Sequence, residues 1–162
     1  MIWYVLAVVV FAGALLALFL IGAAVPRQAR QRFRENRDQL HADFLTVARN
    51  GGKPRGLVWK ALDWTVGGVL PEATLARDRR TGEILALVPV TIQFEAVVGS
   101  DMEGLPAVGN LRNASAVFFY RGGTWHATGR ALFNLNPDEA VAHFKDQFVP
   151  LASPEPPATG IR

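Results

Sequence analysis

The residues whose types and spacing could support chemistry lie on two predicted strands. His126, Thr128 and Arg130 alternate along one of them and are expected to share a face. If the strand over residues 84–98 is a neighbour, Glu95 lies on the same side. A carboxylate, an imidazole and a guanidinium that meet in the concave face of a sheet could perform acid–base catalysis or bind an anion. The alternative interpretation is that they form the solvent-exposed face of an antiparallel sheet.

Other kinds of site find little support in the composition. The chain has no cysteine, which excludes disulfides, thiolate metal sites and a cysteine nucleophile. The three histidines match no metal-binding spacing. Residues 51–56 (GGKPRG) lack the spacing of a phosphate-binding loop and precede a predicted strand, not a helix. The sequence therefore predicts neither a metal nor a cofactor.

Residues 2–25 form a long segment without a charge. The hydrocarbon core of a bilayer is about 30 Å thick. A helix of this length, which rises about 1.5 Å per residue, would cross it. Trp3 and Tyr4 stand at its start, where amphipathic rings favour the membrane interface. A cleaved signal peptide is the alternative, but no basic residue precedes the segment and its apolar part is longer than such peptides need. We expect a transmembrane anchor over residues 1–26, with a helix break or kink at Pro26.

Five arginines follow the anchor directly: Arg27, Arg30, Arg32, Arg34 and Arg37. Residues 27–37 carry a net charge of +4, so the rest of the chain carries −1. Basic residues that flank a span stay on the cytoplasmic side and contact anionic lipid. This pattern predicts a single-pass protein of the inner membrane, with its N-terminus outside and its C-terminal domain in the cytoplasm. Membrane lipid is then a partner, and nucleic acid is not.

Residues 27–149 are expected to form one α+β domain. Apolar residues recur at helical spacing over residues 27–49 and predict core packing against a sheet: Phe33, Leu40, Phe44, Val47 and Ala48. Alternating patterns then predict about five antiparallel strands, over residues 56–65, 72–79, 84–98, 114–121 and 124–134. Pro89 suggests an edge position or a bulge in the third strand.

A C-terminal helix completes the predicted domain. Asn136 and Pro137 are favoured at a helix start, and Val141, Phe144 and Phe148 give the helix an apolar stripe. Helices on one side of the sheet would resemble cystatin-like or NTF2-like domains, by analogy alone. Residues 150–162 have the composition of a disordered tail.

Three further marks carry a resemblance: the RTGE turn at 80–83, the GNLRNA segment at 109–114 and the NLNPDEA helix start at 134–140. With them, the chain resembles an uncharacterised family of single-pass membrane proteins of planctomycete-type bacteria. The resemblance implies a bacterial module and supplies no catalytic residues.

These observations favour a membrane-anchored, non-enzymatic binding domain or accessory subunit, whose partner is another membrane protein or complex. The alternative is an enzyme or small-ligand-binding protein with a pocket around Glu95, His126 and Arg130. A filled space behind the sheet would favour the first hypothesis, and a closed pocket lined by these side chains the second.

Overall fold

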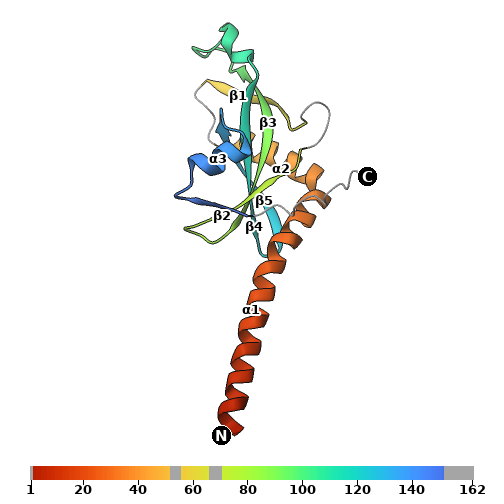
Figure 1. The fold of residues 1–162 in the computed structure, drawn as a ribbon. Helices are drawn as coiled ribbons and strands as arrows, with labels where there is room; N and C mark the ends of the chain where they lie inside the picture. The colour runs from red at the N-terminus through yellow and green to blue at the C-terminus, as the bar shows by residue number, and fades with distance from the viewer. Residues whose placement is uncertain (1, 52–55, 66–70, 152–162) are drawn as a thin grey trace, which may run out of the picture.

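The computed structural model describes residues 2–51, 56–65 and 71–151, without the side chains of residues 2, 5–9 and 13–23. Two helices precede a sheet, and a short helix lies between its last two strands (Figure 1). The elements in order are α1 (Ile2–Glu35), α2 (Arg37–Asn50), β1 (Leu57–Asp63), β2 (Thr74–Asp78), β3 (Ile84–Ala96), the 3-10 helix η1 (Pro106–Gly109), β4 (Arg112–Arg121), β5 (Thr124–Phe133), α3 (Pro137–His143) and β6 (Phe148–Pro150). The domain is therefore α+β, as expected from the sequence.

The six strands form one antiparallel sheet in the order β5-β4-β3-β2-β6, and β1 pairs with β3 beside β2. The long strand β3 is central and not at the edge of the sheet, and its register with β4 runs through Pro89 without a bulge. Pro89 pairs with Ser115 of β4 on one flank. On the other flank of β3, the pairing with β2 extends only as far as Leu87 of β3, and the pairing with β1 starts only at Thr91 of β3. A residue without a main-chain N–H is tolerated there because none of the described strands pairs with it on that flank.

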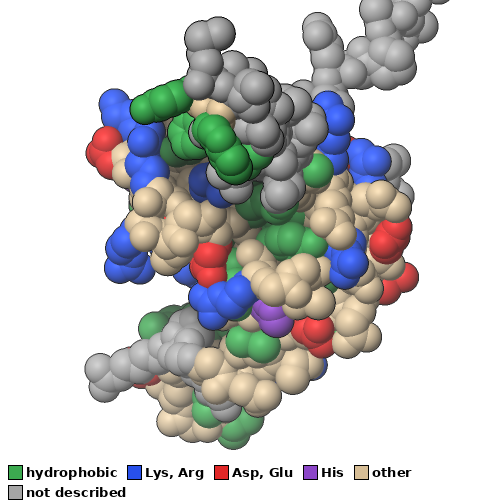
Figure 2. All heavy atoms as spheres, turned by 90° about the horizontal axis from the view of Figure 1, so that it is seen from below, with side chains coloured by type: hydrophobic (Ala, Val, Ile, Leu, Met, Phe, Trp, Pro, Cys, Tyr) green, Lys and Arg blue, Asp and Glu red, His purple; other side chains and the backbone are tan. Residues whose placement is uncertain are grey.

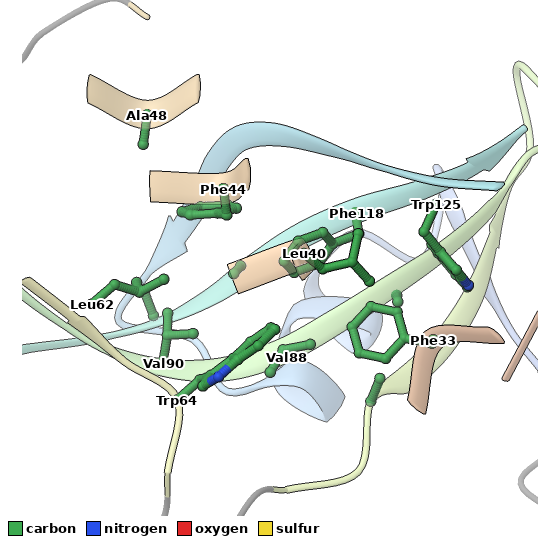
Figure 3. Close-up of a cluster of buried hydrophobic side chains, with 14 of the residues drawn as sticks. Phe33, Leu40, Phe44, Ala48, Leu62, Trp64, Val88, Val90, Phe118 and Trp125 are labelled. Atoms are coloured by element: carbon green, nitrogen blue, oxygen red, sulfur yellow. The ribbon is translucent and has the colours of Figure 1, made fainter. Parts of the chain in front are cut away.

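The helix α2 covers one face of the sheet and fills the space behind it with side chains. Phe33 at the end of α1 and Phe44 in α2 both contact the ring of Phe118 on β4. Trp59 and Phe94 extend this aromatic cluster along β1 and β3. Figure 3 shows the helix side chains pointing onto the strands. The predicted helical stripe is thus core, except for Val47, which is exposed.

The opposite face is also covered, so the expectation of helices on one side only is wrong. Ala140 and Val141 of α3 pack with Leu85 and Leu87 of β3. Successive side chains of β3 point alternately to the two faces of the sheet. Since both faces are covered here, all residues of Ile84–Val88 are buried. This burial on both faces explains why the polar partners of the alternating pattern begin only after Pro89.

The C-terminal helix is shorter than predicted. It ends at His143, and Phe148 belongs to the additional strand β6, which pairs with β2. Pro150 is part of that strand and the main-chain N–H of Leu151 bonds to Leu75, so the predicted tail does not begin at residue 150. A spacing of four between Phe144 and Phe148 fits a helix, but here it spans a turn. Residues 152–162 lie outside the described residues.

Of the predicted break or kink at Pro26, the break is wrong, because α1 continues through this residue to Glu35. A proline fits a helix when its ring is accommodated, at the cost of one main-chain hydrogen bond. The helix instead ends at Asn36, whose side-chain amide donates to the main-chain oxygen of Arg32. The chain changes direction there, and α2 continues across the sheet toward the end that lies away from the N-terminus (Figure 1).

Candidate functional site

The sheet register separates the three residues of the predicted catalytic group. His126 of β5 lies opposite Phe119 of β4, which lies opposite Leu85 of β3. Glu95 is ten residues further along β3, which corresponds to about 33 Å of strand. Glu95 and His126 therefore lie at opposite ends of the sheet and cannot act on one substrate group.

His126, Thr128 and Arg130 are all exposed, as the solvent-face interpretation predicts. The His126 ring stacks on Phe119 with centroids 5.0 Å apart and bonds to the hydroxyl of Thr124. Three residues, Thr128 to Arg130, lie opposite the single Val117 of β4, which forms a bulge in β5. The Thr128 hydroxyl donates to the main-chain oxygen of Val117 over 2.7 Å, so it serves the bulge.

Trp3 and Tyr4, predicted at the membrane interface, lie in the first turn of α1 and are 84% and 81% exposed. This end of α1 projects away from the domain (Figure 1). A search of the described residues finds no helix that is long and apolar enough to cross a membrane.

Several of the arginines after the apolar segment hold α1 on the domain. Arg34 and Arg30 approach the carboxylate of Glu72, at 2.7 Å and 4.0 Å. Arg32 donates to a main-chain oxygen in the β4–β5 turn over 2.8 Å. Arg27 is exposed one turn nearer the N-terminus. The predicted anchor residues therefore divide between contacts inside the domain and the surface.

A large cleft lies at the other end of the sheet, where β4 begins and β5 ends. It has a volume of about 960 Å³, and the middle of β3 is part of its wall. Its polar lining includes four asparagines and two charged residues: Asn110, Asn113, Asn134, Asn136, Arg112 and Glu139. We call it the asparagine cleft.

Two of these side chains are committed to the start of α3. The Asn136 side chain accepts from the main-chain N–H of Glu139, and the Glu139 carboxylate accepts from that of Asn136, both over 3.0 Å. Within the described part of the chain, the side chains of Asn110, Asn113 and Asn134 make no hydrogen bond. These amides can therefore donate to and accept from a ligand.

A second, apolar hollow adjoins the asparagine cleft. It has a volume of about 230 Å³ and is lined by Leu57, Phe94 and Phe133 together with Arg112 and Asn134. Arg112 and Asn134 line both spaces, so the two form one continuous surface. The Arg112 guanidinium lies over the Phe94 ring, 6.0 Å from its centroid.

This arrangement suits binding better than proton transfer. The carboxylate of the cleft, Glu139, already caps a helix. Amides match the donors and acceptors of a peptide main chain, a guanidinium pairs with a carboxylate, and the hollow can take one apolar side chain. The described residues contain no group of three metal-ligating side chains.

The sequence pattern did not predict the asparagine cleft, although its residues lie in two of the marked segments, GNLRNA and NLNPDEA. The sequence did contain one indication of the cleft, because asparagines are frequent around the start of β4 and the end of β5. Asn134 has φ +58°, a conformation that asparagine tolerates better than most residues. What brings the two segments together is the pairing of β4 with β5, which no local pattern displays.

Comparison with family models, with curated proteins and with solved structures gives no match to this chain. The resemblance to planctomycete-type membrane proteins and the cystatin-like or NTF2-like analogy thus rest on sequence pattern alone.

Proposed function

We propose that this protein is a membrane-anchored, non-enzymatic binding domain, or accessory subunit, that presents the asparagine cleft to another membrane protein or complex. The observation that carries the proposal is the continuity of α1. Its first 24 residues bear no charge, and its last turns belong to the core of the domain. A helix of 34 residues extends about 51 Å, enough for a bilayer span and a further stretch.

The connection between anchor and domain is stiff. Ala29 and Phe33 of α1 are buried, and the Trp125 indole of β5 donates to the main-chain oxygen of Ala29. A flexible linker would let the domain sample all directions, whereas a continuous helix fixes the face that it turns away from the membrane. The asparagine cleft lies on that distal side of the sheet.

Alkaline carbonate extraction of membranes tests the anchor. The full chain should stay in the pellet, and the double substitution Val9→Arg and Leu16→Arg should release it, because each charge in the hydrocarbon core is costly. Gln28→Arg adds a charge outside the apolar segment and should leave the chain in the pellet. Release of the unmodified chain would refute the anchor.

Orientation follows from the arginines beyond residue 26. We propose that the domain is cytoplasmic, since these charges flank only the C-terminal end of the apolar segment. A reporter that is active only outside the cytoplasm should stay silent at the C-terminus and become active at the N-terminus. The opposite pattern would reverse the orientation without removing the anchor.

The enzyme alternative loses its geometric basis with the separation of Glu95 from His126. A binding role for the asparagine cleft is tested by a photo-crosslinking amino acid at exposed Leu111, which lines it. Crosslinking to a membrane protein should fall when Arg112→Ala removes the guanidinium. Arg130→Ala, an exposed arginine away from the cleft, is the control and should have no effect.

A further inference from the structure

The turns of two hairpins lie at the end of the domain from which α1 projects (Figure 1). They are the β2–β3 turn at residues 79–83 and the β4–β5 turn at residues 122–123. Val25, the last residue of the apolar segment, shares a hollow of about 320 Å³ with Gly82, Gly122 and Gly123. Both turns therefore lie beside the point on α1 where its apolar segment ends.

Positive charge gathers at this proximal end. Arg79 and Arg80 are exposed in the first turn, and Arg27 is exposed on α1. Figure 2 views the molecule from this end and shows Lys and Arg side chains on several sides of the helix, with acidic side chains among them. Of the described residues, none places a carboxylate within salt-bridge distance of Arg27, Arg79 or Arg80.

The acidic residues nearby are partly occupied. Glu83 binds Arg121 over 2.6 Å. Asp78 is buried and accepts from the main-chain N–H groups of Arg80 and Thr81, which holds the turn in place. Its other oxygen accepts from Gln147. Glu83 is therefore engaged by Arg121, whereas the Asp78 carboxylate also attracts the charge of Arg80.

A hollow of about 550 Å³ adds a place for a headgroup. It is lined by three arginines, Arg79, Arg80 and Arg130, and by Asp146 and Gln147. Three guanidinium groups against one carboxylate favour an anion, and guanidinium pairs with phosphate through paired hydrogen bonds.

The turn that follows β3 is acidic, although Arg112 at the start of β4 is also distal. Because β3 runs from the proximal to the distal end, the turn after it is distal, and this turn carries Asp101 and Glu103 without a basic residue. The acidic turn and the turn that bears Arg79 and Arg80 therefore lie at opposite ends of β3.

We infer that the proximal end is a docking surface for anionic phospholipid headgroups, with Arg79 and Arg80 as its principal contacts. The inference rests on the proposed anchoring by α1, because that span places both turns at the membrane surface. Each arginine near an anionic leaflet contributes favourably, and salt screens the attraction. The domain would thus lie against the membrane that holds its anchor.

The test uses the full chain in vesicles of phosphatidylcholine alone or with phosphatidylglycerol. Since the chain has no cysteine, Thr81→Cys gives a single site for a fluorophore that a lipid-borne quencher can reach. Ser100→Cys, in the distal turn, is the matched control label. We expect quenching at residue 81 in the anionic vesicles, little in phosphatidylcholine, and none at residue 100.

Substitution of Arg79→Gln with Arg80→Gln should lower the ratio of docked to undocked domain roughly thirtyfold, and raised salt should act in the same direction. Arg112→Gln, a distal arginine, should not change it. Flotation with both vesicle types reports the anchor separately. If the chain does not float, the anchor is refuted. If the chain floats but the quenching at residue 81 does not depend on lipid charge, on salt or on these arginines, only the docking surface is refuted.

Discussion

The indole Nε1–H of Trp125 donates a buried hydrogen bond of 2.8 Å to the main-chain oxygen of Ala29. The two residues are 96 positions apart and join the β4–β5 hairpin to the last turns of α1. The Phe33 ring packs on the same indole with centroids 5.1 Å apart. These contacts therefore fix the direction of α1 relative to the sheet.

Trp125→Phe should lower the free energy of unfolding by more than the loss of buried apolar area predicts. The additional loss is the hydrogen bond to Ala29, because such a bond contributes about 1 kcal/mol net. Trp64→Phe removes a similar area from the same core without a described hydrogen bond and is the control. Chemical unfolding of the full chain in detergent measures both. Equal losses would show that the Ala29 contact adds no stability.

Phe94→Ala should lower the free energy of unfolding by about 3–5 kcal/mol, the usual cost for a buried phenylalanine. Phe94 is buried between Trp59 and Phe133. Val98→Ala, at an exposed position just beyond β3, should cost little. An unchanged midpoint for Phe94→Ala would mean that this face of β3 is not packed.

Asp78 should make stability depend on pH. Burial opposes the charge of its carboxylate, but hydrogen bonds from Gln147, Thr81 and Arg80 outweigh burial and hold the pKa below its ordinary value. A lowered pKa gives stability that is complete above the pKa of the unfolded chain, about 3.9, and is lost as pH falls through the lower folded value. Asp78→Asn keeps an oxygen for the turn but sets an amide against the Gln147 amide.

We therefore expect Asp78→Asn to lose about 1–3 kcal/mol at pH 7 and to flatten the fall in stability as the pH drops below about 4. Urea unfolding across this range measures it. Asp101→Asn, in the exposed distal turn, is the control for general charge effects. An acid profile unchanged by Asp78→Asn would assign the fall to other carboxylates.

Local patterns predicted the elements whose signals are contained within one segment. The alternation from Ile84 to Phe94 identified the central strand and its core face. The helix start predicted at Asn136 and Pro137 is confirmed, and Glu139 adds a reciprocal cap that was not predicted. The Gly122–Gly123 turn joins β4 to β5 as expected. Each of these depends on neighbours within a few residues, so the sequence displays it directly.

Elements defined by distant partners were not predicted. The strand β6 has three residues, too few for a period, and exists because β2, some 70 positions earlier, offers it hydrogen bonds. The asparagine cleft needs the register between β4 and β5. The prediction that Glu95 and His126 lie close together was wrong. Alternation predicts which face of the sheet a residue occupies, but it does not predict where along the neighbouring strand that residue lies.

Gly129 gives the last prediction, because its backbone and its surroundings both require glycine. It lies in the β5 bulge with φ +66°, and a Cβ there would stand 2.9 Å from the main-chain nitrogen of Ala48 in α2. That atom belongs to helix backbone, so relief requires α2 to move away from the sheet. The Phe44 and Ala48 side chains, which are buried under α2, would move with it.

Gly122→Ala is the matched control. Gly122 also has positive φ, +59°, but a Cβ there meets open space. The backbone strain of about 1–2 kcal/mol is common to both substitutions. Gly129→Ala should cost about 1–3 kcal/mol more, the usual penalty for overpacking. Chemical unfolding measures the difference, and hydrogen exchange should show lower protection in α2 for Gly129→Ala alone. If the two variants lose equal stability and α2 keeps its protection, the close approach of β5 to α2 does not constrain the fold.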